Sequence, residues 1–214
     1  MRTWRVLAIS SVAVTLLAGS AMAQGRGRGF GFQRSPMEVV AIPEVQTELK
    51  LDQTQKDLIG ALTERYRQEA RSLFQSLRDL SEEDRRTRIR ELTTKYDREL
   101  AGILKPDQTK RLNQIVWQAR GPSVVLEEAV GSQLRLTADQ RNRIQAIVEQ
   151  MAQARRQAFQ NAQGNFQGVQ QQLQQLRQQE EQQINAVLTE TQRSKLREIL
   201  GPPFQLPPPR RGNN

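Results

Sequence analysis

The chain offers few residue types that could do covalent chemistry. Its 214 residues include no Cys and no His, so it has no thiol nucleophile, no imidazole base and no ordinary zinc ligand set. It also lacks a Gly-x-Ser-x-Gly nucleophile motif and a phosphate-binding loop motif. Carboxylates remain, but the neighbours in Glu127-Glu128 and in Glu180-Glu181 would point about 100° apart on a helix. We therefore expect solvated carboxylates, no catalytic residues, no metal site and no cofactor.

A different pattern recurs four times: a Leu, a residue at the helix-cap position, and a Gln four positions after the Leu. The Leu positions are 51, 104, 136 and 188, so the first and third copies are 85 residues apart and the second and fourth 84. A capping side chain with Gln at the third helical position satisfies backbone amides at a helix start, and Pro in the second copy suits the first helical position. We predict that the motif starts helices and aligns hairpins rather than binding a ligand. The motif residues are Leu51, Asp52, Gln55, Leu104, Pro106, Gln108, Leu136, Thr137, Gln140, Leu188, Thr189 and Gln192.

Apolar residues between the motif copies are spaced by three and four positions, which is the period of an amphipathic helix. Such stripes run from Ile59 to Leu80, from Ile89 to Ile103, from Ile144 to Ala158 and, with an interruption at Glu180, from Val169 to Val187. No segment alternates with period two over a useful length. The sequence therefore predicts an all-α fold of tandemly duplicated, long antiparallel helical hairpins, each with a short capping helix, at 106–119 and 189–200.

The N-terminal residues 1–23 fit a signal peptide. Arg2 and Arg5 precede an apolar stretch of 13 residues, and Ala21-Met22-Ala23 supplies the small residues before a cleavage point. This stretch is shorter than the ~20 residues that cross a bilayer. We therefore expect cleavage after Ala23, export to the periplasm or an equivalent space, and no transmembrane anchor after cleavage.

The mature chain divides by composition into four segments. Two helical repeats, 42–120 and 121–201, lie between a Gly/Arg-rich arm at 24–41 and a Pro-rich tail at 202–214. Both ends are predicted to be disordered, because neither composition can build a core.

The basic charge lies largely at the ends of the chain. The formal net charge is +9, whereas the helical body is nearly balanced. A broad nucleic-acid-binding face would need a larger clustered excess of Lys and Arg, so we expect no specific nucleic-acid partner. The Gly/Arg arm could contact a polyanion, or it could be a solvated linker.

The paired Leu-Thr-x-x-Gln motifs resemble those of the Spy/CpxP family of periplasmic chaperones and envelope-stress regulators. Segments 42–51 and 111–115 are similar to uncharacterised exported proteins of planctomycete type that are often assigned to that family. The resemblance implies thin helical hairpins that dimerise into a cradle and bind unfolded clients without ATP. This chain carries two motif pairs, so one chain could supply both halves of the cradle. A related branch is implicated in zinc resistance, but the Cys and His ligands that zinc favours are absent here.

The function implied is that of an exported, ATP-independent, chaperone-like protein that binds unfolded or partner polypeptides on an amphipathic helical surface. The alternative is a structural or interaction protein of the cell envelope with one fixed partner. Metal sensing and catalysis are disfavoured. The chain would act as a pseudo-dimeric monomer or as a homodimer. Candidate client contacts are Arg65, Arg85, Arg86, Arg155 and Arg156.

The capping role predicts the effect of Thr137→Ala. The substitution removes the hydroxyl that caps a helix while Gln140 remains, so it should lower the free energy of unfolding by ~1 kcal/mol. Thermal unfolding followed by circular dichroism measures this loss, with little change expected in client affinity. Unchanged stability together with lost binding would make the motif a binding site instead.

Overall fold

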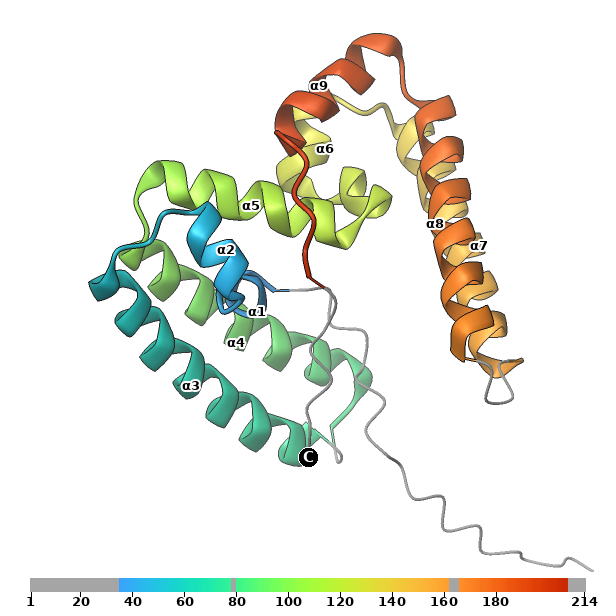
Figure 1. Cartoon of the computed structure of the whole chain (residues 1–214). Helices are drawn as coiled ribbons and strands as arrows, with labels where there is room; N and C mark the ends of the chain where they lie inside the picture. The colour runs from blue at the N-terminus through green and yellow to red at the C-terminus, as the bar shows by residue number, and fades with distance from the viewer. Residues whose placement is uncertain (1–34, 78–79, 162–165, 208–214) are drawn as a thin grey trace, which may run out of the picture. The chain divides into compact units, whose positions relative to one another are not determined.

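The computed structural model describes residues 35–77, 80–161 and 166–207. Every regular element in these residues is a helix, so the all-α prediction is confirmed (Figure 1). The predicted signal peptide, most of the Gly/Arg arm and the last residues, 208–214, lie outside the described ranges.

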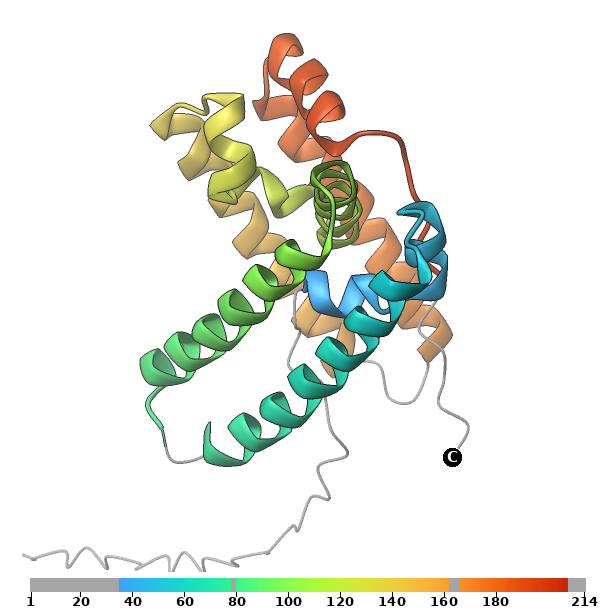
Figure 2. The ribbon, with the colours of Figure 1, turned by 90° about the vertical axis from the view of Figure 1, so that its left-hand side faces the viewer.

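The first half of the described chain contains five α-helices. Two short helices precede two long ones that lie side by side and run in opposite directions (Figures 1 and 2). A fifth helix follows the long pair. The bounds are α1 Pro36–Val40, α2 Pro43–Glu48, α3 Gln53–Ser76, α4 Glu82–Ile103 and α5 Pro106–Arg120.

The second half repeats this order of elements. A 3-10 helix leads into one short helix, two long helices that pack against each other, and a final shorter helix. The bounds are η2 Pro122–Leu126, α6 Glu128–Leu134, α7 Ala138–Gln160, α8 Phe166–Val187 and α9 Glu190–Leu200. That the two halves arose by duplication stays a prediction from the sequence.

The two halves share an unusual backbone detail just before the first motif of each. Lys50 and Arg135, which are 85 residues apart, hold positive φ angles of 51° and 50°. The left-handed conformation is unfavourable for residues with a Cβ atom. In each half, the residue with this conformation ends the short helix, α2 or α6. The next residue, Leu51 or Leu136, is buried in the interior.

Each half has its own apolar cluster. In the first, Ile59, Leu62 and Tyr66 of α3 pack with α4 residues such as Tyr96 and with the buried faces of α1 and α5. In the second, Ile144 of α7 and Ile184 of α8 pack with η2, α6 and α9. The four motif Leu residues divide between them: Leu51 and Leu104 lie in the first cluster, Leu136 and Leu188 in the second.

The prediction that the arm is disordered as far as residue 41 was wrong for its last residues. Ser35 caps α1, and its hydroxyl accepts a hydrogen bond from the Glu38 amide at 3.3 Å. Met37, Val39 and Val40 are completely or almost completely buried. This segment is too short to show a helical period in the sequence. It is ordered because Ser35 caps the helix and its three apolar side chains pack against α3 and α4.

The prediction of a disordered tail was also wrong for residues 202–207. This extended segment leaves α9, passes α5 and ends near α2 (Figures 1 and 2). Phe204 and Leu206 are partly buried against the first apolar cluster. Two apolar side chains among the prolines therefore anchor a segment whose composition alone suggested disorder.

Glu180 does not lie on a solvated face, contrary to the sequence prediction. It is 2% exposed, and its carboxylate accepts two hydrogen bonds from the Arg155 guanidinium, at 2.9 and 3.3 Å. The pair joins α7 to α8 where the apolar stripe of α8 is interrupted. Burial of the carboxylate is tolerated because the planar guanidinium satisfies both oxygens.

The buried Arg155–Glu180 pair predicts that one substitution lowers the free energy of unfolding more than two substitutions do. Arg155→Leu leaves a buried carboxylate without its partner, so it should lower the free energy of unfolding by about 2 kcal/mol. Adding Glu180→Leu completes the apolar stripe and should recover most of that loss. Urea unfolding of both variants measures the difference, and a double variant no more stable than Arg155→Leu would contradict this account.

Candidate functional site

The glutamines of the first two motif copies meet face to face although they are 53 positions apart. The Gln55 amide nitrogen donates to Gln108 Oε1 at 2.8 Å, and the Gln108 amide nitrogen donates back to Gln55 Oε1 at 3.1 Å. Each nitrogen also donates to a main-chain carbonyl at a helix end, that of Ile103 or Leu49. Each oxygen also accepts the backbone N–H of its own cap residue, Asp52 or Lys105.

The second half contains the same arrangement. Gln140 and Gln192 exchange amide hydrogen bonds of 2.8 and 2.9 Å. Their nitrogens also donate to the carbonyls of Val187 and Leu134, and their oxygens accept from the amides of Thr137 and Thr189. The helix starts of α7 and α9 are therefore tied together as those of α3 and α5 are.

These contacts define what the motif can do. A Gln side chain has two N–H donors and one oxygen with two acceptor positions, and all of them are used in each of the four glutamines. Gln55 and Gln108 are also buried. The motif glutamines therefore have no free hydrogen-bonding capacity for a ligand, and their geometry is that of a clamp between two helix starts. We call each reciprocal pair a glutamine clamp.

Most of the arginines predicted as client contacts have partners within their own hairpin. Arg65 pairs with Glu99 at 2.7 Å across α3 and α4, and Arg86 pairs with Glu82. Arg85 donates to the Leu80 carbonyl at 2.9 Å, and Arg155 is bound to Glu180. Arg156 is exposed. A client role for these side chains stays a prediction, and the first four would have to exchange contacts to bind one.

One carboxyl group with an altered pKa lies where α4 faces the end of α5. Burial raises the pKa of Asp97 to about 6, although the nearby positive charge of Arg120 lowers it. Arg120 itself pairs with Glu127 at 2.7 Å. Asp97 Oδ1 is buried without a hydrogen-bond partner among the described residues. Burial thus disfavours the charged form of this carboxyl group near neutral pH.

A groove that no sequence motif indicates lies between α5, α8 and α9. Its cavity volume is about 450 Å³, and it is open to solvent. Two of its apolar residues, Val124 and Ile184, are buried, so they form the floor. The apolar lining is completed at the sides by Trp117, Leu196, Leu200 and Pro203. We call this the Trp117 groove.

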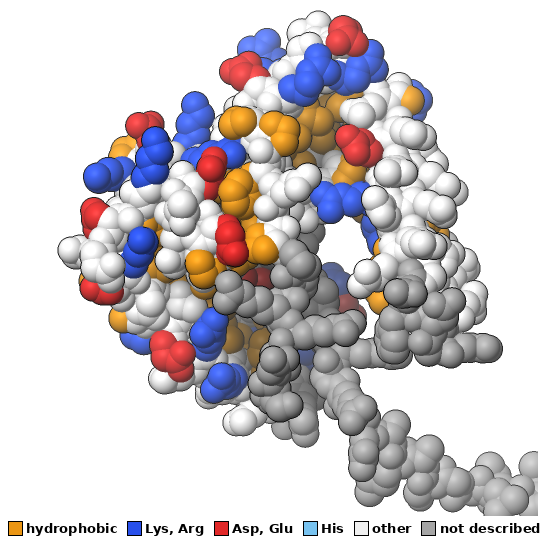
Figure 3. Space-filling view, viewed as in Figure 1, with side chains coloured by type: hydrophobic (Ala, Val, Ile, Leu, Met, Phe, Trp, Pro, Cys, Tyr) orange, Lys and Arg blue, Asp and Glu red, His pale blue; other side chains and the backbone are white. Residues whose placement is uncertain are grey.

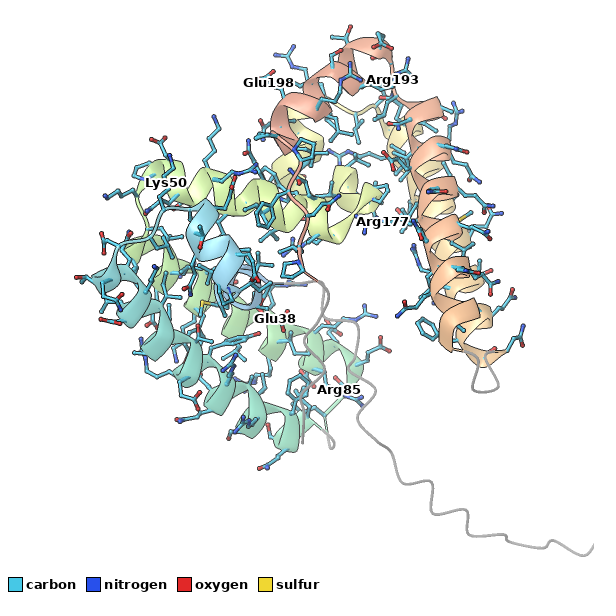
Figure 4. The ribbon with its side chains drawn as sticks, viewed as in Figure 1. Glu38, Lys50, Arg85, Arg177, Arg193 and Glu198 are labelled. Carbon is cyan, nitrogen blue, oxygen red and sulfur yellow. The ribbon has the colours of Figure 1, made fainter. Side chains whose placement is uncertain are left out.

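Charged side chains of both signs line the rim of the Trp117 groove. Arg177 and Glu181 come from α8, and Arg197 comes from α9. Arg177 reaches from α8 toward α5 and donates to the Gln118 carbonyl at 2.9 Å (Figure 4). Figure 3 shows apolar side chains on this face, with basic and acidic groups beside them. Such a lining suits a ligand that is mainly apolar and carries polar or mixed-charge groups.

The sequence carried only a weak signal for this groove. Trp117 is a large aromatic residue on a helix expected to cap a hairpin, but the groove residues that α8 and α9 contribute lie 60 or more positions away from it. The packing of α9 against α5 and of α8 against η2 brings these segments together.

Comparison with protein-family models, with curated proteins and with solved structures finds no match for this chain. The resemblance to the Spy/CpxP family accordingly stays a prediction based on the motif.

Two further features bear on the site within the described ranges. No group of three or more acidic, His or Cys side chains there is arranged to hold a metal ion. No helix in those same ranges is long and apolar enough to span a bilayer.

The glutamine clamp predicts a large difference between two neighbouring glutamines. Gln55→Ala leaves several buried donors and acceptors unpaired on Gln108 and the main chain, so it should lower the free energy of unfolding by about 2–3 kcal/mol. Gln53→Ala, on the exposed side of the same helical turn, should change it by less than about 0.5 kcal/mol. Chemical unfolding followed by circular dichroism compares them, and equal losses would show that the clamp contributes no more than a surface contact.

Proposed function

We propose that this protein is an exported, ATP-independent, chaperone-like protein that binds unfolded polypeptide segments. The observation that carries the proposal is the Trp117 groove, an open trough with an apolar floor and charged groups of both signs on its rim. An unfolded chain presents apolar side chains separated by polar and charged ones, which is the chemistry that this lining complements.

The size and openness of the groove favour a segment of polypeptide over a small enclosed ligand. About 450 Å³ accommodates a few side chains, and the opening lets the rest of a long chain extend beyond it. Neither Arg177 nor Glu181 is buried, so both can adapt to clients of different charge. This supports binding of several sequences with modest affinity rather than of one ligand with high affinity.

The glutamine clamps support the proposal indirectly. They fix the starts of α3, α5, α7 and α9 through buried or partly buried side chains, so the helical faces between them remain available for binding. Export follows in the proposal from the leader at 1–23, which lies outside the described residues.

Trp117 provides the test, because a chain beginning at Gln24 contains no other tryptophan. Titration with reduced, carboxymethylated ribonuclease A, which stays unfolded and contains no tryptophan, should shift the emission of Trp117 to shorter wavelength and saturate. Folded ribonuclease A should cause no shift. Several unrelated unfolded proteins that lack tryptophan should give the same response, whereas a response to none of them would contradict the proposal.

A pair of variants on α8 localises the binding. Asn185 lines the groove and Gln182 is exposed outside it. Asn185→Lys introduces a charge beside the apolar floor and should weaken binding about fivefold or more, which corresponds to ~1 kcal/mol. Gln182→Lys adds the same charge to the same helix and should leave the affinity unchanged. Equal effects of the two variants would place the client elsewhere.

A further inference from the structure

The segment 202–207 already occupies part of this face as an extended polypeptide. The Gln118 amide nitrogen donates to the carbonyls of Leu200 and Pro202, at 2.6 and 2.9 Å. Its oxygen accepts the backbone N–H of Phe204 at 2.8 Å. One side chain thus binds both a carbonyl and an amide of the segment, and these groups are present in any peptide.

A second α5 residue extends this contact along the helix. Arg111 donates to the Pro202 carbonyl at 2.9 Å, and its guanidinium is held in place by Glu48 at 2.7 Å. Arg111 and Gln118 are seven positions apart, so they lie on one face of α5, two turns from each other. Gln114, between them on that face, lies directly beneath Gly201. A Cβ atom at Gly201 would approach the Gln114 side chain to 2.4 Å, so glycine allows the segment to lie close to α5.

The side chains of the segment follow the alternation of an extended chain. Phe204 and Leu206 are partly buried against the first apolar cluster, whereas Gln205 between them is exposed. Pro203 lines the Trp117 groove. No residue from 201 to 207 is charged, so backbone hydrogen bonds and apolar contacts account for the recognition.

We propose that this face of α5 is a binding site for extended, proline-rich polypeptide segments with two apolar residues spaced two apart, and that residues 202–207 occupy it as an intrachain ligand. An extended segment with fixed proline φ angles loses little conformational entropy on docking. The site is continuous with the Trp117 groove through Pro203. That the ligand is a polypeptide rests on the proposed function. The sequence pattern that such a ligand must carry is taken from the docked segment 202–207.

Because the segment 202–207 is attached to α9, it competes for the site much more effectively than a free peptide of the same sequence. A short linker places an intrachain ligand at an effective concentration on the order of millimolar. A free peptide of the same sequence should therefore bind the wild-type chain poorly and should bind well once the attached segment is released. In a chaperone, this arrangement would keep the site closed until a client competes for it.

The test uses the full chain from Gln24 and a fluorescein-labelled peptide, Gly-Pro-Pro-Phe-Gln-Leu-Pro-Pro, followed by fluorescence anisotropy. Phe204→Asp in the protein releases the attached segment without altering α5. It should tighten peptide binding by at least about tenfold, as expected if the segment occupies the site more than nine-tenths of the time. The matched control is Gln205→Asp, which adds the same charge at an exposed position and should leave peptide binding at the wild-type level.

Two further arms define the recognition. Gln118→Leu, added to Phe204→Asp, removes the hydrogen bonds to the peptide backbone and should abolish the gain. A peptide with Asp in place of Phe should not bind any of these proteins. If circular dichroism shows that Phe204→Asp loses helix, the milder pair Phe204→Ala and Leu206→Ala replaces it with the same expectation.

The outcomes separate this inference from the proposed function. If the released chain binds the peptide no better than wild type does, or binds the Asp-containing peptide equally well, the inference is wrong. The Trp117 response to unfolded proteins would then still stand or fall by itself. If the peptide binds only the released chain but no unfolded protein changes Trp117 emission, the site is specific for proline-rich segments and the general chaperone proposal is wrong.

Discussion

Reciprocal hydrogen bonding between two glutamine side chains holds the helix starts together in both halves of the chain. In each half of the chain it joins two helix starts about 52 or 53 positions apart. It satisfies buried main-chain groups at helix ends as well as the side chains themselves. Such a pair tolerates few replacements, because an apolar residue or a shorter amide would leave several buried polar groups unpaired. The clamps therefore determine which helix starts lie next to each other and how these helices are aligned.

The clamps also explain how a chain with so few large apolar residues holds long hairpins. Apolar residues make up 36% of the sequence, and the exposed face of α8 consists mostly of Gln. The clusters are concentrated near the clamped ends, where the motif Leu residues, the short helices and α5 or α9 meet. Farther along the second hairpin, the buried Arg155–Glu180 pair joins α7 to α8.

Local signals predicted the fold well and the candidate site poorly. Capping residues and helical periodicity act within a few positions, so Asp52, Thr137 and Thr189 could be assigned as helix caps from the sequence, and each caps a helix. The pairing of the glutamines could not be predicted, because the sequence does not show which helix starts face each other. The matched spacing of the motif copies indicated only that they align the hairpins. Glu180 was misplaced because its partner lies 25 positions away. Phe204 and Leu206 were assigned to disorder because the surface that orders them belongs to α5 and its neighbours, which composition cannot show.

The proposed site of polypeptide binding is the face formed by α5, α9 and the segment 202–207. Hydrogen–deuterium exchange of the full chain, with and without saturating unfolded client, tests this location. We expect slower exchange in the C-terminal half of α5 and in α9, with faster exchange at the Phe204 amide as the client displaces its hydrogen bond to Gln118. Slower exchange confined to the outer faces of α7 and α8, with the Phe204 amide unchanged, would contradict it.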